Sequence, residues 1–115
     1  MRNFRTLDIW KEGIEITREI YENLDYFPNR ERYGLLSQIC RSAVSIPSNI
    51  AEGASRDNKE YKRFLSFALG SSFELETQLI IASQIGYFKD EICKDLLLKL
   101  NVLQRRINSF RNSLK

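Results

Sequence analysis

The sequence predicts an all-α protein, an antiparallel up-down-up-down four-helix bundle, on three observations. Groups of helix-breaking residues divide the chain into four stretches, 6–25, 31–54, 58–86 and 90–114. Within the stretches, apolar and small residues recur at alternating spacings of three and four residues, the period of an amphipathic helix. The connections between the stretches are short, which favours antiparallel neighbours.

Length and composition indicate a single domain over residues 1–115. With 43% apolar and 29% charged residues, the chain is typical of neither a disordered nor a fibrous protein. Its longest uncharged run, 77–88, is shorter than the roughly 20 residues that cross a bilayer. The opening segment includes Arg2, Arg5 and Asp8 and lacks the pattern of a secretory signal. We therefore expect a cytoplasmic protein without a membrane partner.

Histidine is absent from the sequence, which restricts the available chemistry. Its absence removes the usual general base, the Ser-His and Cys-His nucleophile pairs and the commonest transition-metal ligand. Cys40 and Cys93 alone cannot complete a four-ligand zinc site. Both lie on apolar helix faces and are interpreted as buried free thiols, in preference to a disulfide. We predict no enzymatic activity, no metal and no cofactor.

The first stretch has two apolar stripes, whereas one suffices for a helix in a small bundle. One stripe, which we assign to the bundle core, consists of Leu7, Trp10, Ile14, Thr17, Tyr21 and Leu24. The other consists of Ile9, Ile16, Ile20 and Phe27 and projects roughly 120° away from it. Two adjacent stripes imply two packing partners.

The third and fourth stretches each have one long core stripe. These stripes consist of Tyr61, Leu65, Ala68, Ser72, Leu75, Leu79, Ala82 and Gly86 in the third stretch and of Cys93, Leu96, Leu100, Leu103, Ile107, Phe110 and Leu114 in the fourth. Further apolar residues flank the third stripe on both sides. They are Leu69, Phe73 and Ile80 on one side and Phe67, Ile81 and Ile85 on the other.

This excess of apolar surface predicts contacts between copies of the chain, because monomers rarely expose large contiguous apolar patches. The residues assigned to these contacts are Ile9, Ile16, Ile20, Leu69, Phe73 and Ile80. Closed rings and two-fold dimers are the symmetric arrangements available. The alternative is a monomer whose helices are broadly apolar because they lie centrally.

The second stretch combines an apolar face with a polar stripe. The apolar face consists of Leu36, Ile39, Cys40, Ala43, Ile46, Pro47, Ile50 and Ala54, and the polar stripe of Gln38, Ser42, Ser45, Asn49, Glu52 and Arg56. Either the stripe lines a polar groove or pore, or its short side chains let helices or subunits approach and bond across a tight interface. An active site around Ser42, Asn49 and Glu52 lacks an accompanying nucleophile, metal set or phosphate loop.

Pro47 lies within the predicted second helix. A proline there removes one backbone hydrogen bond and displaces the carbonyl four residues earlier, that of Ala43. We expect a kink at this point, and we expect a nearby side chain or a water to cap the freed carbonyl.

The net charge of +3 is concentrated in the last stretch. Residues 87–115 include seven Lys or Arg and three Asp or Glu, and after Asp95 all charged residues are basic. A second basic group opens the third stretch. The predicted nucleic-acid contacts are Arg56, Lys59, Lys62, Arg63, Arg105 and Arg106. Such residues attract phosphate backbones without reading sequence, and the alternative is a solvated helix face.

Two long motifs, 38–53 (QICRSAVSIPSNIAEG) and 64–79 (FLSFALGSSFELETQL), together with Trp10 and the Phe27-Pro28 turn, resemble the bacterial four-helix bundle family. Some members are encoded by intervening sequences within large-subunit ribosomal RNA genes and are labelled ribosomal proteins for that reason. The resemblance implies a four-helix subunit. Similarity to the accessory variability protein of diversity-generating retroelements implies a pentameric barrel, and that relative binds nucleic acid and a reverse transcriptase through basic surfaces.

Two hypotheses for the function follow. The first is a non-enzymatic homo-oligomeric adaptor, pentameric by resemblance, whose basic surface binds RNA or DNA. The second is a protein-protein interaction scaffold in which the polar stripe of the second helix, or the mouth of a ring, receives another protein. Salt-dependent binding of structured RNA separates the two, because electrostatic binding to phosphates weakens steeply as salt rises.

Overall fold

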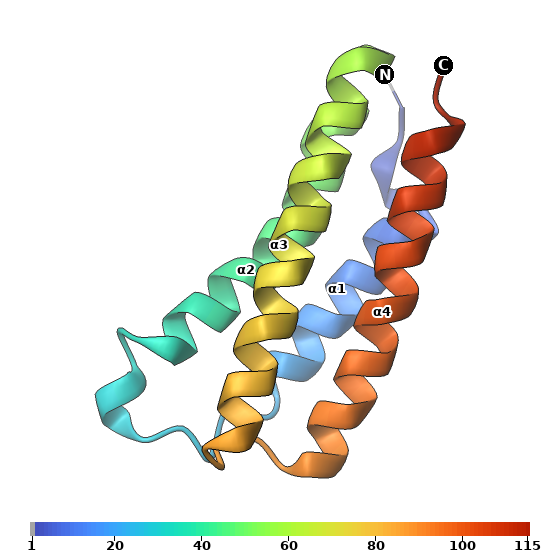
Figure 1. The fold of residues 1–115 in the computed structure, drawn as a ribbon. Helices are drawn as coiled ribbons and strands as arrows, with labels where there is room; N and C mark the ends of the chain where they lie inside the picture. Colours follow the sequence, from blue (N-terminus) through green and yellow to red (C-terminus); the bar gives the residue numbers. More distant parts are fainter. Residues whose placement is uncertain (1) are drawn as a thin grey trace.

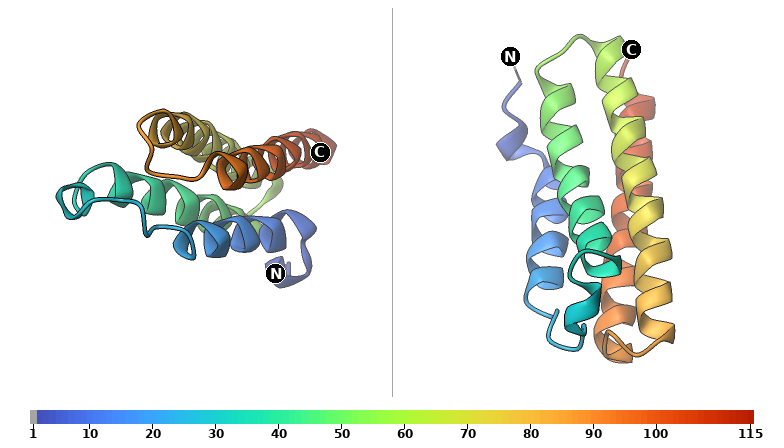
Figure 2. Two further views of the ribbon diagram at one scale, coloured as in Figure 1. Left: turned by 90° about the horizontal axis from the view of Figure 1, so that it is seen from below. Right: turned by 90° about the vertical axis from the view of Figure 1, so that its left-hand side faces the viewer.

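The computed structural model describes residues 2–115, which form a four-helix bundle and confirm the predicted all-α fold. The α-helices are α1 (Asp8–Tyr21), α2 (Leu35–Ala54), α3 (Asn58–Gln84) and α4 (Asp90–Ser113), with two short 3-10 helices, η1 (Phe4–Thr6) and η2 (Asn29–Glu31). Consecutive α-helices run in opposite directions (Figure 1). Seen along its axis, the bundle has two layers, α1 beside α2 and α3 beside α4 (Figure 2).

The core lies between the two layers and contains the stripes predicted for three of the four helices. Apart from Leu69, which is also buried, the core members of these helices are Ile39, Ala43, Ile46, Ile50 and Ala54 from α2, Tyr61, Leu65, Ala68, Leu75, Leu79 and Ala82 from α3, and Cys93, Leu96, Leu100, Leu103 and Ile107 from α4. Each set recurs at spacings of three and four residues, so each helix turns one continuous apolar side inward.

The assignment of the two α1 stripes was wrong. Ile9, Ile16 and Ile20 are at most 6% exposed and lie in the core of a single chain, so they are not available for contacts between copies. The stripe that we assigned to the core lies at its edge and faces α2. Leu7, Trp10 and Leu24 are partly buried against the core, whereas Ile14 and Tyr21 are about half exposed. The reason is that α1 packs against both α2 and α4, and its inner side points between them.

The α3 residues that we assigned to contacts between copies differ in burial. Leu69 is buried among the core residues and offers no contact surface, which corrects its assignment. Phe73 and Ile80 are exposed, because they lie further round the helix, away from the core side.

The helices are shorter than the breaker residues predicted, and side-chain and glycine caps mark several of their ends. α1 ends at Tyr21, four residues early, where the Asn23 amide donates to the Glu19 carbonyl at 2.7 Å. α3 begins directly after its N-cap residue Asp57, whose carboxylate accepts a hydrogen bond from the Glu60 N–H at 2.9 Å. Its other end is closed by Gly86, at φ 86°, in a conformation that suits glycine.

Pro47 lies inside α2, and the helix continues through it from Leu35 to Ala54. The Thr17 hydroxyl of α1 lies 2.8 Å from the Gly13 carbonyl and 3.2 Å from the Ala43 carbonyl, which Pro47 leaves without its helical donor. A side chain therefore caps this carbonyl, as we predicted. Gly13 packs directly on the proline ring, since an added Cβ would lie 3.3 Å from Pro47 Cδ. The kink itself stays a prediction.

Replacing Thr17 with valine is expected to lower the free energy of unfolding by about 1 kcal/mol, because the Ala43 carbonyl loses its donor. Pro47→Ala restores a backbone N–H for the same carbonyl, so Thr17→Val should cost less in that background. Denaturant unfolding of the two single variants and the double variant measures the coupling. Equal costs of Thr17→Val in both backgrounds would mean that the hydroxyl does not cap Ala43.

Candidate nucleic-acid interface

The polar stripe of α2 lies partly against α3. Ser42 is buried, Ser45 and Asn49 are half-buried, and Gln38 and Glu52 are exposed. The Ser45 and Ser71 hydroxyls are 2.8 Å apart across the two helices. The Asn49 amide donates back to the Ser45 carbonyl at 2.8 Å and reaches its hydroxyl at 2.9 Å. The middle of the stripe therefore makes one hydrogen bond from α2 to α3 and further hydrogen bonds within α2.

Two buried polar atoms have no hydrogen-bond partner among the described residues, the Tyr61 hydroxyl and the Gln78 side-chain oxygen. Burial raises the pKa of the Tyr61 phenol, and the Arg2 guanidinium lies over its ring, 4.7 Å from the centroid. The Arg2 side chain also donates to the Arg56 carbonyl at 2.9 Å. The N-terminal segment is thereby attached to the α2–α3 turn.

The antiparallel arrangement brings the basic start of α3 and the basic end of α4 to one end of the bundle. Both chain termini and the α2–α3 turn lie there (Figure 1). The Asn58 amide donates to the Lys115 carbonyl at 3.1 Å, and the Arg111 guanidinium donates to the Ser66 hydroxyl at 3.0 Å. These contacts align the first turns of α3, which include Lys59 and Lys62, with the last turns of α4.

Carboxylates neutralise half of the six predicted nucleic-acid contacts. Arg56 pairs with Glu52 at 2.8 Å, and Arg63 pairs with Glu60 at 3.4 Å. Arg106 pairs with both Asp8 and Glu12 of α1. Among residues 2–115, Lys59, Lys62 and Arg105 form no ion pair. The adjacent arginines 105 and 106 thus point to different sides of α4.

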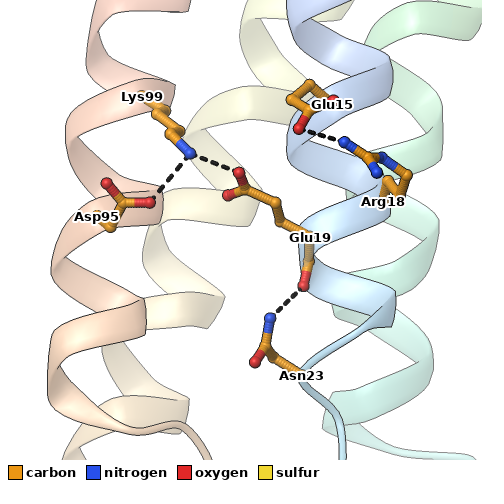
Figure 3. A network of polar contacts seen from close by, with 6 residues as sticks. All are labelled: Glu15, Arg18, Glu19, Asn23, Asp95 and Lys99. Atoms are coloured by element: carbon orange, nitrogen blue, oxygen red, sulfur yellow. Dashed lines mark hydrogen bonds and ion pairs between the residues drawn. The ribbon is translucent and has the colours of Figure 1, made fainter.

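The seam between α1 and α4 is bridged by ion pairs. Lys99 of α4 lies between Asp95, at 3.0 Å, and Glu19 of α1 (Figure 3). Hydrogen bonds to Glu19 and Asp95 raise the pKa of the Lys99 ammonium. Arg106 makes the second bridge, two helical turns along. The basic residues on this side of α4 are therefore engaged with α1 carboxylates.

A long apolar groove runs between α1 and α2 on the outside of the bundle. It is lined by Trp10, Ile14, Thr17, Val44, Pro47, Ser48 and Ala51. A second hollow shares Val44 with it and has a mixed lining of Tyr21, Leu24, Tyr33, Leu36 and Cys40 with Arg32, Ser37, Arg41 and Ser45. Ile14 is 42% exposed and Val44 43%. On the other layer, Phe67, Ile81 and Ile85 of α3 are exposed. The chain thus presents apolar side chains on both layers.

A second groove of about 600 Å³ lies between α3 and α4, and we call it the α3–α4 groove. It is lined by Ser66, Leu69, Gly70, Phe73, Gln104, Arg105, Asn108 and Arg111. Sequence reasoning singled out only Arg105, Phe73 and Leu69 of these and missed the rest. A signal was present, because 66, 70, 73 and 104, 108, 111 repeat the spacings of four and three that place residues on one side of a helix.

Comparison with known proteins places the chain in a family. The family model described as 23S rRNA-intervening sequence protein matches residues 5–109. The chain belongs to this family. A crystal structure of a protein of unknown function from the S23 ribosomal protein family of Bacteroides thetaiotaomicron is similar to this intervening-sequence protein, with a TM-score of 0.82 and 19% identity over 91% of this chain and 99% of that one. The search of curated proteins found no match.

The family description contains no enzymatic activity, and the solved relative is described as a protein of unknown function. Within residues 2–115, no three His, Cys, Asp or Glu side chains are grouped so that they could hold a metal ion. No helix in that part of the chain is long and apolar enough to span a membrane. Both cysteines are buried free thiols, and burial raises the pKa of each.

Proposed function

We propose that this intervening-sequence protein is a cytoplasmic, non-enzymatic, homo-oligomeric adaptor whose basic surface binds the backbone of RNA or DNA. The observation that carries the proposal is the gathering of basic residues from α3 and α4 at one end of the bundle. Lys59 and Lys62 there, and Arg105 about two turns before the end of α4, form no ion pair with the rest of the described chain, so their charges are available to phosphates.

Self-association is supported by the apolar side chains exposed on both layers. The α1–α2 groove and the Phe67, Ile81 and Ile85 surface are different patches, so a contact that joins the first patch of one copy to the second patch of the next would be heterologous. Heterologous contacts close into rings when the rotation between copies allows it. A pentamer, which the resemblance to the accessory variability protein implies, is one such ring, and it would repeat the basic end around its axis.

The test of nucleic-acid binding is filter binding with a structured RNA from low to physiological salt. Binding should weaken steeply, with a slope of log affinity against log salt set by the number of phosphates contacted. Lys59→Gln with Lys62→Gln should weaken binding to every sequence alike and reduce the slope by about 2. The matched control is Lys89→Gln with Lys94→Gln, two exposed lysines at the other end of α4, which should bind as the wild type does.

Absence of binding at low salt would contradict the proposal. Equal weakening by both lysine pairs would show that net charge, and not this end of the bundle, attracts the RNA. A protein partner that is retained after nuclease treatment, in a chain that binds no RNA, would favour the scaffold hypothesis instead.

A further inference from the structure

We propose that the α3–α4 groove binds a single strand of RNA or DNA, with its arginines at the phosphates and the Phe73 ring against an unstacked base. This inference rests on the proposed function, because it names the form of nucleic acid and the site that receives it. The groove differs from the rest of the basic end in combining two arginines that form no ion pair with the described residues, neutral hydrogen-bonding groups and an exposed aromatic ring.

The groove has more positive than negative charge. Its described lining contains Arg105 and Arg111 and no carboxylate. Arg111 donates to two neutral acceptors, the Ser66 hydroxyl at 3.0 Å and the Asn108 amide oxygen at 2.7 Å, so its guanidinium is held in place and keeps its full charge. Arg106, one residue from Arg105, pairs with two carboxylates instead. The positive field of this part of α4 therefore points into the groove.

The neutral polar groups of the groove suit sugars and base edges. Gln104 and Asn108 lie one turn apart on α4, and their side-chain amides can donate and accept without adding charge. The Gln104 amide donates to Glu76 at 2.9 Å, so the negative charge of Glu76 lies at the edge of the groove and the Gln104 oxygen stays available as an acceptor. Arginines for phosphates together with amides for base edges are the chemistry of nucleic-acid recognition.

Phe73 supplies the feature that distinguishes a single strand from a duplex. Its side chain is 53% exposed at the wall of the groove. Gly70, one turn earlier, leaves the approach open, since a Cβ built there meets no atom within 4 Å. An exposed aromatic ring beside arginines is the arrangement on which bases of a single strand stack. A duplex keeps its bases stacked on one another and offers this ring no free base.

The experiment is fluorescence anisotropy with a labelled single-stranded oligonucleotide and a hairpin duplex of the same charge, both at low salt. The wild type should bind the single strand more tightly than the duplex. Phe73→Leu keeps an apolar side chain but removes the aromatic face, so it should weaken single-strand binding about 10-fold and leave duplex binding unchanged. Arg105→Gln with Arg111→Gln should weaken single-strand binding about 10-fold or more and reduce its salt dependence. Arg106→Gln, the matched control, should have the smallest effect of the arginine variants.

Three results would overturn the inference. If the wild type binds duplex and single strand equally and Phe73→Leu changes neither, the groove is not a single-strand site, although the proposed function stands. If no nucleic acid binds at low salt, both proposals fail. If Phe73→Leu reduces the mass measured by light scattering while its circular dichroism is unchanged, the ring lies between copies of the chain and not against a base.

Discussion

Replacing Gly53 with alanine should destabilise the protein more than the same change at Gly13 or Gly70, the other glycines inside the described helices. A Cβ at this position would lie 2.8 Å from Phe64 Cβ and 2.9 Å from Tyr61 Cδ1, where α2 and α3 approach each other. Phe64 Cβ is attached to the backbone, so the whole helix must move to accommodate the methyl group. Overpacking costs up to about 3 kcal/mol, and the helix propensity of alanine returns about 1, which leaves a net loss of about 2 kcal/mol in the free energy of unfolding.

Gly70→Ala is the matched control for that change. Gly70 also lies inside a helix, but a Cβ there meets nothing within 4 Å. The substitution should therefore raise the free energy of unfolding by about 0.5 to 1 kcal/mol through helix propensity alone. Both variants are measured by denaturant unfolding at one protein concentration, because the proposed self-association would make stability depend on concentration. Similar effects of the two substitutions would show that α2 and α3 are not in close contact at Gly53.

Ile14→Glu combined with Val44→Glu should convert the proposed pentamer into a monomer of 13.5 kDa. Both side chains are nearly half exposed in the single chain, so acidic groups there can remain hydrated when the chain is alone. In a contact between copies the same groups would be buried without partners, at a cost of several kcal/mol for each ion. Light scattering measures the mass, and circular dichroism checks that the helices remain.

The conservative pair Ile14→Leu and Val44→Ile keeps the α1–α2 groove apolar and should leave the mass unchanged. A wild-type mass of 13.5 kDa would remove the basis for an oligomer. An oligomer that is unaffected by the two glutamates would place the contact elsewhere, with the exposed Phe67 and Ile81 surface as the next to test.

Much of the fold could be predicted because the stripes of α2, α3 and α4 are unambiguous. In α4, for example, Cys93, Leu96, Leu100, Leu103 and Ile107 share one side, so the orientation that buries this side buries most of the apolar residues, while Leu98 and Val102 stay exposed. The need of the Ala43 carbonyl for a new donor also followed from Pro47 alone. Thr17 could not be identified as that donor, because it comes from another helix, 26 residues away in sequence.

The α1 stripes show where a pattern is insufficient. Both stripes are apolar, and periodicity does not reveal which of two apolar sides faces inward when a helix has two neighbours. Likewise, Arg105 and Arg106 are equivalent as sequence, but a rotation of about 100° sends one to the α3–α4 groove and the other to the carboxylates of α1.

By itself, then, the sequence determined the four helices, their antiparallel order, most of the core and the basic character of α4, since all of these depend on local spacing and composition. Only the tertiary structure decided which α1 stripe is buried, which arginines keep a free charge, and that 66, 70 and 73 lie opposite 104, 108 and 111. The physical reason is that burial, ion pairing and grooves are properties of two or more helices packed together, and the pattern of one helix does not contain the position of its neighbours.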